Sequence, residues 1–255
     1  MTPYTKEIQS LQHPTVKHLV KLRREKGYRA QCQTFLIEGK KMVFECPLPI
    51  KTLLIEKGAE IPKHLKAETT LIITKEILEK MSGTKTPEPY LAEIPFPTPS
   101  SLKGKQKLLA LDRIADPGNV GTLIRTALAL GFDGVFLTIG SADPFMDKAL
   151  RASKGATLHL PIHIGSEEEL RALIAENHLT PYIADSRGQI EKDFTVPLIL
   201  ILGSESHGPT ETLKKMGTLI SIPITKQTES LNVAVAGGIL MNKIQEMTCP
   251  KTTTT

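Results

Sequence analysis

The sequence predicts an α/β fold in two domains: a small N-terminal domain, and a larger C-terminal domain with a mostly parallel sheet and helices on both faces. Apolar runs of strand length alternate with helix-length segments along the chain, which is typical of α/β proteins. A segment rich in proline, serine and glycine interrupts this alternation once. We therefore expect domains over 1–95 and 107–248, a linker over 96–106 and a disordered tail over 249–255.

The first domain is expected to contain one long helix, three strands and a short helix. The long helix is predicted over 14–29, because Pro14 suits an early helical position and Val16 and Leu19 share one face. The remaining elements are recognised by their apolar runs: strands at FLIEG (35–39), IKTLLIE (50–56) and TTLIIT (69–74), and a short helix at 75–83.

The second domain repeats the alternation more regularly. Its helices include 167–178. Near-continuous apolar runs separated by helix-length segments indicate parallel strands that are covered on both faces. These strands are predicted at KLLALD (107–112), GVFLTI (134–139), HLPIHI (159–164), PYIAD (181–185), PLILIL (197–202) and LISIPI (219–224).

Composition argues against several classes of protein. No apolar run reaches the roughly 18 to 20 residues needed to cross a bilayer, and the N-terminus lacks the apolar core of a signal peptide. The three cysteines, Cys32, Cys46 and Cys249, are odd in number and form no C-x-x-C. We therefore expect neither a disulfide scaffold nor a zinc ribbon, but a cytoplasmic protein with no membrane partner.

Basic charge is concentrated in the first part of the chain. Residues 1–105 carry 18 Lys or Arg against 11 Asp or Glu, whereas the remaining residues carry 14 against 16. On the long helix, the basic side chains away from the apolar face are Lys17, Lys21, Arg24 and Arg29. Such a face fits an anionic polymer, because each neutralised phosphate releases counterions. A solvated helix surface explains the charge equally well.

A ligand pocket is predicted where the stretch 198–241 brings together two strand ends and one helix start. The first strand ends in a glycine-rich turn that holds Glu205, and the second ends at Pro223. A helix then opens at Glu229 and continues almost without polar residues to Met241. In open α/β sheets, ligands bind in the crevice beyond the carboxyl ends of the strands. We therefore expect a backbone-lined pocket here.

The second domain opens with another strand, turn and helix, LDRIADPGNVGTLIRTALALG. Leu123 and Ile124 belong to the apolar stripe of the helix, and Arg125 lies off that stripe. Taken alone, Asn119 is explained as a helix N-cap and Arg125 as a surface charge.

Several common sites are not found in the sequence. It contains no G-x-x-x-x-G-K-[ST] and no complete G-x-G-x-x-G after a strand, which argues against a P-loop NTPase and a nucleotide-dependent oxidoreductase. His159 and His163 alternate with apolar residues in a predicted strand, where packing explains them. No cluster of carboxylates and histidines indicates a metal site, so we expect none.

Three stretches considered together resemble one family. DPGNVGTLIRTALALG, LGSESHG and ISIPITKQTESLNVAVA have the residue types, order and spacing of the three motifs of the SpoU (TrmH-type) RNA 2′-O-ribose methyltransferases, in the SPOUT superfamily. This resemblance covers residues 107–247. IQSLQHPTVKHLVKL, FLIEGKKMVFE and SGTKTPEP also resemble the substrate-binding domain that precedes the catalytic domain in members acting on ribosomal RNA.

The resemblance implies a fold, a cofactor and partners. The cofactor is S-adenosyl-L-methionine, and the C-terminal domain is a SPOUT domain with a trefoil knot. The N-terminal domain binds RNA, and the substrate is most simply ribosomal RNA. The resemblance also implies a homodimer through the C-terminal helix region, which agrees with the apolar, small-residue run at 231–241.

The resemblance assigns roles to particular residues. The catalytic positions of the three motifs correspond to Asn119, Arg125, Glu205, Ser230 and Asn232. Cofactor contacts, made largely through backbone groups, map onto Gly203, Ile222 and Leu231. The chain departs from the family at the expected rim of the pocket, in the run 224–227 and at Ser206 and His207.

The expected chemistry suits these residue types. A ribose 2′-hydroxyl is a poor nucleophile until its proton leaves, so an enzyme must align it and stabilise the negative charge on its oxygen. We expect Arg125 to stabilise that charge, and the other catalytic residues to position Arg125 and the ribose. Two alternatives remain open: a non-catalytic RNA-binding or ribosome-assembly protein on the same fold, and a methyltransferase that acts on tRNA.

Overall fold

The computed structural model describes residues 4–97, 101–225 and 227–248. The tail predicted at 249–255 and positions 98–100 of the predicted linker lie outside the described residues. The chain forms two compact units: the first contains the residues up to Thr98 together with Phe145–Leu158, and the second contains Pro99–Pro144 and the residues from His159 onward. No pattern in the sequence predicts that Phe145–Leu158 packs with the first unit.

The first unit is built on a five-stranded sheet in the order β1-β4-β3-β5-β2. Strands β1, β4 and β3 are parallel, whereas β5 is antiparallel to both β3 and β2. Two of these strands were not predicted, because β1 is short and polar and a charged residue interrupts β5. The strand bounds are β1 (Tyr4–Ile8), β2 (Thr34–Glu38), β3 (Ile50–Glu56), β4 (Ala67–Ile73) and β5 (Tyr90–Pro95).

Helices pack against this sheet through two apolar clusters. One cluster joins α1 (Pro14–Arg24) and α4 (Lys75–Met81) to the sheet. The other contains residues of α3 (Lys40–Phe44) and three side chains from the later segment, Phe145, Leu150 and Leu158. That segment forms α6 (Asp147–Ser153) and a 3₁₀ turn, η1 (Ala156–Leu158). Phe145 also contacts the Phe35 ring, with centroids 4.9 Å apart.

The single helix predicted over 14–29 is two helices. Glu25 has an extended backbone and separates α1 from α2 (Lys26–Cys32). Arg29 from α2 is buried, and its guanidinium donates hydrogen bonds to the carbonyl oxygens of Leu22 and Arg23. These carbonyls end α1 and lack partners within the helix, so Arg29 acts as their cap. The prediction that Arg29 belongs to the exposed basic face is therefore wrong.

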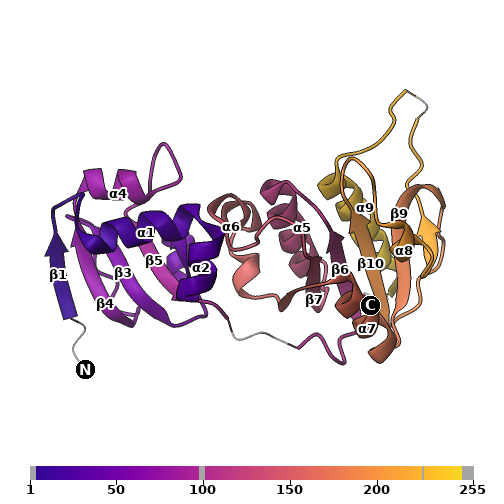
Figure 1. Ribbon diagram of the computed structural model, residues 1–255, viewed down its shortest axis with the longest axis horizontal. Helices are drawn as coiled ribbons and strands as arrows, with labels where there is room; N and C mark the ends of the chain where they lie inside the picture. The colour runs from indigo at the N-terminus through magenta and orange to yellow at the C-terminus, as the bar shows by residue number, and fades with distance from the viewer. Residues whose placement is uncertain (1–3, 98–100, 226, 249–255) are drawn as a thin grey trace, which may run out of the picture. The chain divides into compact units, whose positions relative to one another are not determined.

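The second unit is built on a six-stranded sheet in the order β11-β9-β10-β6-β7-β8, and every strand pair is parallel, as predicted (Figure 1). Strand β10 is fully buried in the middle of the sheet. The strand bounds are β6 (Lys107–Asp112), β7 (Gly134–Thr138), β8 (Ile162–Gly165), β9 (Thr180–Gln189), β10 (Leu198–Gly203) and β11 (Thr218–Ile220). The helices are α5 (Pro117–Ala129), α7 (Glu167–Glu176), α8 (Glu211–Lys214) and α9 (Val233–Thr248).

Four element boundaries in this unit differ from the predictions by more than two residues. The strand predicted at 181–185 is β9 and continues to Gln189. The strand predicted at 159–164 begins only at Ile162, because the 3₁₀ turn η1 and Pro161 precede it, so His159 is not in a strand. The strand predicted at 219–224 is β11 and ends at Ile220. The last helix begins at Val233, because the Oδ1 atom of Asn232 accepts hydrogen bonds from the backbone N–H groups of Ala234 and Val235, at 2.9 and 3.3 Å.

Candidate active site

The first motif places Asn119 in the first turn of α5. The helix is capped by Asp116, whose Oδ1 accepts a hydrogen bond from the backbone N–H of Asn119 at 3.0 Å. Asn119 is therefore not the N-cap, and that explanation of it is wrong. Since Asp116 satisfies the backbone N–H, the side chain of Asn119 remains available for contacts across the site.

The second motif holds Glu205 at the tip of a tight loop after β10. The backbone N–H of Gly208 donates to the carbonyl of Ser204 at 2.8 Å, which closes the loop. At Gly203, a Cβ atom would lie 1.9 Å from the backbone nitrogen of Pro209, so a side chain cannot be accommodated. The strand thus turns directly into the loop, and Glu205 is exposed at its end.

A chain of side-chain hydrogen bonds joins the three motifs. Asn119 Nδ2 donates to Glu205 Oε1 at 2.7 Å, and Asn232 Nδ2 donates to Asn119 Oδ1 at 3.2 Å. Asn232 is itself fixed, because its Oδ1 caps α9. An amide has both donor and acceptor atoms, so Asn119 can receive from one motif and donate to another. The structure therefore brings together three of the five residues predicted to be catalytic.

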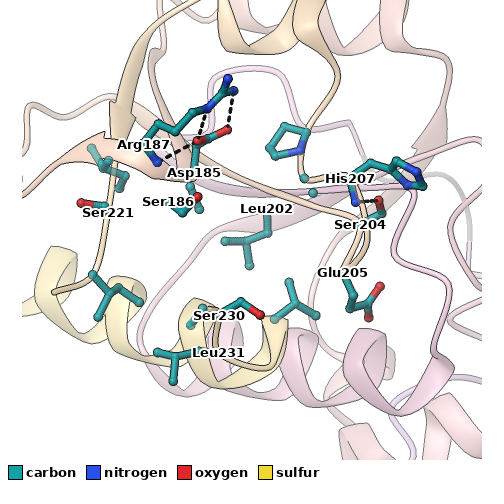
Figure 2. A pocket seen from close by; sticks show the side chains of 18 of the residues that line it. Asp185, Ser186, Arg187, Leu202, Ser204, Glu205, His207, Ser221, Ser230 and Leu231 are labelled. Carbon is teal, nitrogen blue, oxygen red and sulfur yellow. Dashed lines mark hydrogen bonds and ion pairs between the residues drawn. The ribbon is translucent and has the colours of Figure 1, made fainter. Parts of the chain in front are cut away.

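A pocket of about 480 Å³ lies beside this network. Five of the eight predicted site residues line it: Gly203, Glu205, Ile222, Ser230 and Leu231. In Figure 2, Glu205 lies on one side of the pocket, and Asp185 and Arg187 lie on the other. The side chains of Leu202 and Leu240 form an apolar part of the pocket wall. The departures from the family at Ser206 and His207 also lie on the lining, as expected for the rim.

Arg125 is the one predicted site residue that belongs neither to the hydrogen-bonded network nor to the lining of the pocket. It is exposed on α5, does not line the pocket and forms no hydrogen bond or ion pair with any described residue. Leu128 lies three positions further along the same helix and is 39% exposed although it is apolar. Among the residues that the structure describes, Arg125 is therefore a cation without a partner, on a partly apolar helix face.

A charged cluster in the second half of β9 was missed by the sequence analysis. The carboxylate of Asp185 accepts from Arg187 Nε and Nη2 at 3.0 and 3.1 Å, and Lys214 Nζ lies 3.1 Å from its Oδ2. The hydrogen bond from Arg187 holds the pKa of the Asp185 carboxyl well below its usual range, and Lys214 acts in the same direction. The sequence did contain a signal for this cluster, because the predicted strand PYIAD ends on Asp185 and ligands bind beyond the carboxyl ends of strands. In the structure, β9 lies between β10 and β11, the two strands that lead into the predicted pocket.

With this geometry in place, comparison with known proteins identifies the family. Residues 106–242 match the SpoU rRNA methylase family, and residues 13–92 match the MRM3-like substrate binding domain. The chain belongs to the SpoU rRNA methylase family. The resemblance found in the sequence and the predicted enzyme class, a methyltransferase, are therefore both confirmed.

Named relatives of this SpoU methylase span nearly its whole length. It is 31% identical to the 23S rRNA (guanosine(2553)-2′-O)-methyltransferase RlmP of Bacillus subtilis (strain 168), over 92% of this chain and 98% of that protein. The AdoMet-bound rRNA methyltransferase from Sinorhizobium meliloti superimposes with a TM-score of 0.84 at 26% identity, covering 96% of this chain and 99% of that one.

A more distant structure supports the fold alone. The SpoU methyltransferase AviRb from Streptomyces viridochromogenes has a TM-score of 0.83 at 22% identity, covering 92% of this chain and 97% of that one. The fold class predicted from the sequence, an N-terminal α/β domain followed by a SPOUT-type domain with a parallel sheet, is confirmed by these likenesses.

Proposed function

We propose that this SpoU methylase transfers a methyl group from S-adenosylmethionine to a ribose 2′-hydroxyl of ribosomal RNA. The observation that carries the proposal is the hydrogen-bonded chain Asn232–Asn119–Glu205, which joins three segments distant in sequence beside one pocket. RNA binding alone would not require a hydrogen-bonded network of this kind. The names of RlmP and of the Sinorhizobium meliloti enzyme support ribosomal RNA as the substrate.

The residues of the pocket fit S-adenosylmethionine. A volume of about 480 Å³ lies within the range of small-molecule sites, roughly 300 to 1,000 Å³. The apolar wall suits the adenine, and the missing side chain at Gly203 lets the loop backbone close around the pocket. We assign the cofactor contacts to Gly203, Ile222 and Leu231. When bound, S-adenosylmethionine supplies an electrophilic methyl group.

The protein's own residues would align the ribose and stabilise charge on its oxygen. Glu205 fixes the amide of Asn119, and Asn232 fixes the other end of the same amide, so that Asn119 has one orientation. Ser230 lies on the pocket lining and can donate a hydrogen bond to the ribose or its phosphate. An arginine is a permanent cation in proteins, so Arg125 acts as a donor to the ribose oxygen rather than as its base.

The exposed face of α5 and α9 supports a homodimer. These helices pack against each other, yet Leu128, Val235 and Ile239 are 39%, 52% and 44% exposed. A helix that is apolar on nearly every side is normally buried all round, and a two-fold contact with a second copy would bury this face. Arg125 lies on α5 one turn before Leu128, so the second copy would also reach Arg125. Sedimentation of a 28.0 kDa species at micromolar concentration would contradict the dimer.

The N-terminal domain is assigned to RNA binding. Lys17, Lys21 and Arg24 are exposed on α1 and can contact phosphates. The match of residues 13–92 to a substrate binding domain supports this assignment.

Two further assignments come from the family resemblance. We place a trefoil knot in the C-terminal part of the SPOUT domain, and the strand order, in which β10 lies between β6 and β9 while β11 lies outside β9, supports it. We assign the enzyme to the cytoplasm. In the described part of the chain, no helix has the length and apolar character needed to span a bilayer.

The proposal is tested by mapping ribose methylation in total RNA from a strain that lacks the gene and from its parent. We expect one 2′-O-methyl mark in ribosomal RNA to disappear and to return when the gene is restored. Loss of a mark in tRNA alone would move the substrate to tRNA. An unchanged methylation map would contradict the enzyme assignment.

A further inference from the structure

A buried carboxylate, Asp112, lies at the end of β6 and takes no part in the network described above. It is 1% exposed and is not on the lining of the pocket. An ionised carboxylate buried to this extent needs hydrogen-bond donors for its two oxygens. The identity of these donors connects Asp112 to the active site.

The donors to Asp112 come from three places in the chain. Thr138 Oγ1, at the end of β7, donates to Oδ1 at 2.9 Å. The backbone N–H of Thr210 donates to Oδ2 at 3.0 Å, and Thr210 is the last residue of the loop over 203–210 that presents Glu205, the Glu205 loop. Arg113 adds its guanidinium, with Nε 3.3 Å from Oδ1 and Nη2 3.2 Å from Oδ2. These four contacts use the acceptor capacity of the carboxylate.

The Glu205 loop is attached to Asp112 at both of its ends. Gly203, where the loop starts, is the register partner of Asp112 in the β10–β6 pair, and Thr210, where it ends, donates to the carboxylate. Arg113 Nη2 also approaches the carbonyl oxygen of Gly208 at 3.5 Å. The loop that presents Glu205 therefore has a buried carboxylate and a guanidinium at its base.

The backbone at Arg113 adopts an unusual conformation that accompanies this contact. Arg113 has φ +55°, a left-handed conformation that non-glycine residues rarely adopt and that often marks a functional constraint. Its N–H donates to Thr138 Oγ1 at 3.0 Å, which holds this turn in place. At Gly140, a Cβ atom would lie 3.3 Å from Arg113 Cγ, so the glycine leaves room for the arginine.

From this arrangement we infer that Asp112, held by Arg113 and Thr138, is a positioning residue that sets the place of the Glu205 loop and thereby the contact between Glu205 and Asn119. Asp112 touches neither Glu205 nor Asn119 in the structure, so it acts through the backbone of the loop. The inference rests on the proposed function only for its effect on catalysis. Its effect on the loop can be measured without cofactor or RNA.

The test compares Thr138→Val, Thr138→Ser and Ser141→Ala in the full-length protein. Thr138→Val keeps the shape of the side chain but removes the hydroxyl that donates to Asp112 and accepts from Arg113. Thr138→Ser restores that hydroxyl. Ser141→Ala is the matched control, because Ser141 is also buried near the end of β7 and its hydroxyl donates to the carbonyl of Leu111 without touching Asp112.

Two measurements are made on each variant, amide hydrogen exchange over residues 203–213 and single-turnover methyl transfer. For Thr138→Val we expect faster exchange at Thr210 and slower transfer by about 10- to 100-fold, the scale on which a misplacement of about 1 Å acts. Thr138→Ser should restore both values, and Ser141→Ala should change neither. Unchanged exchange at Thr210 in Thr138→Val would overturn the inference. If the wild type transfers no methyl group, the proposed function fails, while the exchange data still decide the role of Asp112.

Asp112→Asn supplies a second variant in case Thr138→Val does not fold. It keeps the size of the side chain but removes the charge that the Arg113 fork binds. We expect faster exchange at Thr210 in this variant too, and exchange at the wild-type rate would equally overturn the inference.

Discussion

Asn119 and Glu205 lie 86 positions apart in the chain, and the amide of one donates to the carboxylate of the other over 2.7 Å. The contact connects the helix after β6 with the loop after β10, two neighbouring parallel strands. Asn232 extends it to the start of α9. The three residues that we propose to be catalytic therefore form a hydrogen-bonded line across one strand end and two helix starts.

The donor–acceptor direction of these hydrogen bonds can be tested at Asn119, the central residue of the three. Asn119→Asp replaces the donor that faces Glu205 with a carboxylate, so two negative charges meet. We expect methyl transfer to fall by about 10²- to 10³-fold, the scale for losing one preorganised donor. Glu205→Gln retains an acceptor oxygen and should lose less activity. Single-turnover rates measure both, and equal losses would contradict the assigned direction of the hydrogen bond.

Arg125 is expected to matter for chemistry and not for folding. It has no partner among the described residues of the chain, so Arg125→Ala should leave the melting temperature nearly unchanged. Transfer should fall by roughly 10²- to 10³-fold if the guanidinium stabilises the ribose oxygen. Arg125→Lys should also be slow, because an ammonium group cannot reproduce the planar fork.

The contrast with Arg125 is Leu123, which is fully buried two positions earlier. Leu123→Ala should lower the free energy of unfolding by about 2 to 5 kcal/mol through the cavity it leaves. Near wild-type transfer by Arg125→Ala would remove its catalytic assignment.

Gly203→Ala should disrupt the site through the backbone. The new Cβ would lie 1.9 Å from the nitrogen of Pro209 and 2.1 Å from the carbonyl carbon of Gly208, so the Glu205 loop must move. We expect calorimetry to show much weaker binding of S-adenosylmethionine. The control is Gly27→Ala on α2, where no heavy atom lies within 4 Å of the new Cβ. Cofactor affinity at the wild-type level in Gly203→Ala would argue against a role of this loop in binding.

The sequence predicted the parallel sheet and the three motif segments because both are local in character. Apolar runs such as LILILG specify a buried strand, and the motifs lie at strand ends and helix starts. Long-range contacts cannot be read this way. The packing of Phe145 on Phe35 and the burial of Arg29 both depend on residues brought together only by folding. The Asn119–Glu205 contact is of the same kind, and it was the family resemblance that pointed to those residues.

The stability of the protein should depend on pH through Asp185. The pKa of this carboxyl is lowered in the folded state by the hydrogen bond from Arg187 and by Lys214. Its stabilising contribution is therefore fully present above the unfolded pKa of about 3.9 and is lost as the pH falls below it. We expect Asp185→Asn to melt below the wild type at pH 7, and the difference to shrink below about pH 4. A difference that stays constant down to pH 3 would contradict this account of the ion pair.

The basic face of α1 should contribute RNA affinity by neutralising phosphates. Replacing Lys17 and Lys21 with alanine should weaken binding and reduce the slope of log affinity against log salt by about 0.7 to 0.9 for each phosphate that is no longer neutralised. Lys63→Ala, in the loop between β3 and β4, is a charge-matched control for each substitution. Equal affinity and slope in wild type and double variant would exclude this face.

Arg29→Ala tests whether Arg29 stabilises the fold by capping α1 rather than binding RNA. Because the guanidinium is buried and caps α1, its removal should lower the free energy of unfolding by about 1.5 to 3 kcal/mol for each charged hydrogen bond that it makes. The melting curve measures this effect. Unchanged stability would contradict the capping role.

The most direct test of the account is the chemical position of the transferred methyl group. Full-length protein is incubated with ribosomal RNA lacking the mark and with S-adenosylmethionine that carries an isotopically labelled methyl group. The RNA is then digested to nucleosides for mass spectrometry. The account predicts label in one 2′-O-methylnucleoside, and its loss with Asn119→Asp. Label on a base, or no label from protein shown by calorimetry to bind the cofactor, would contradict it.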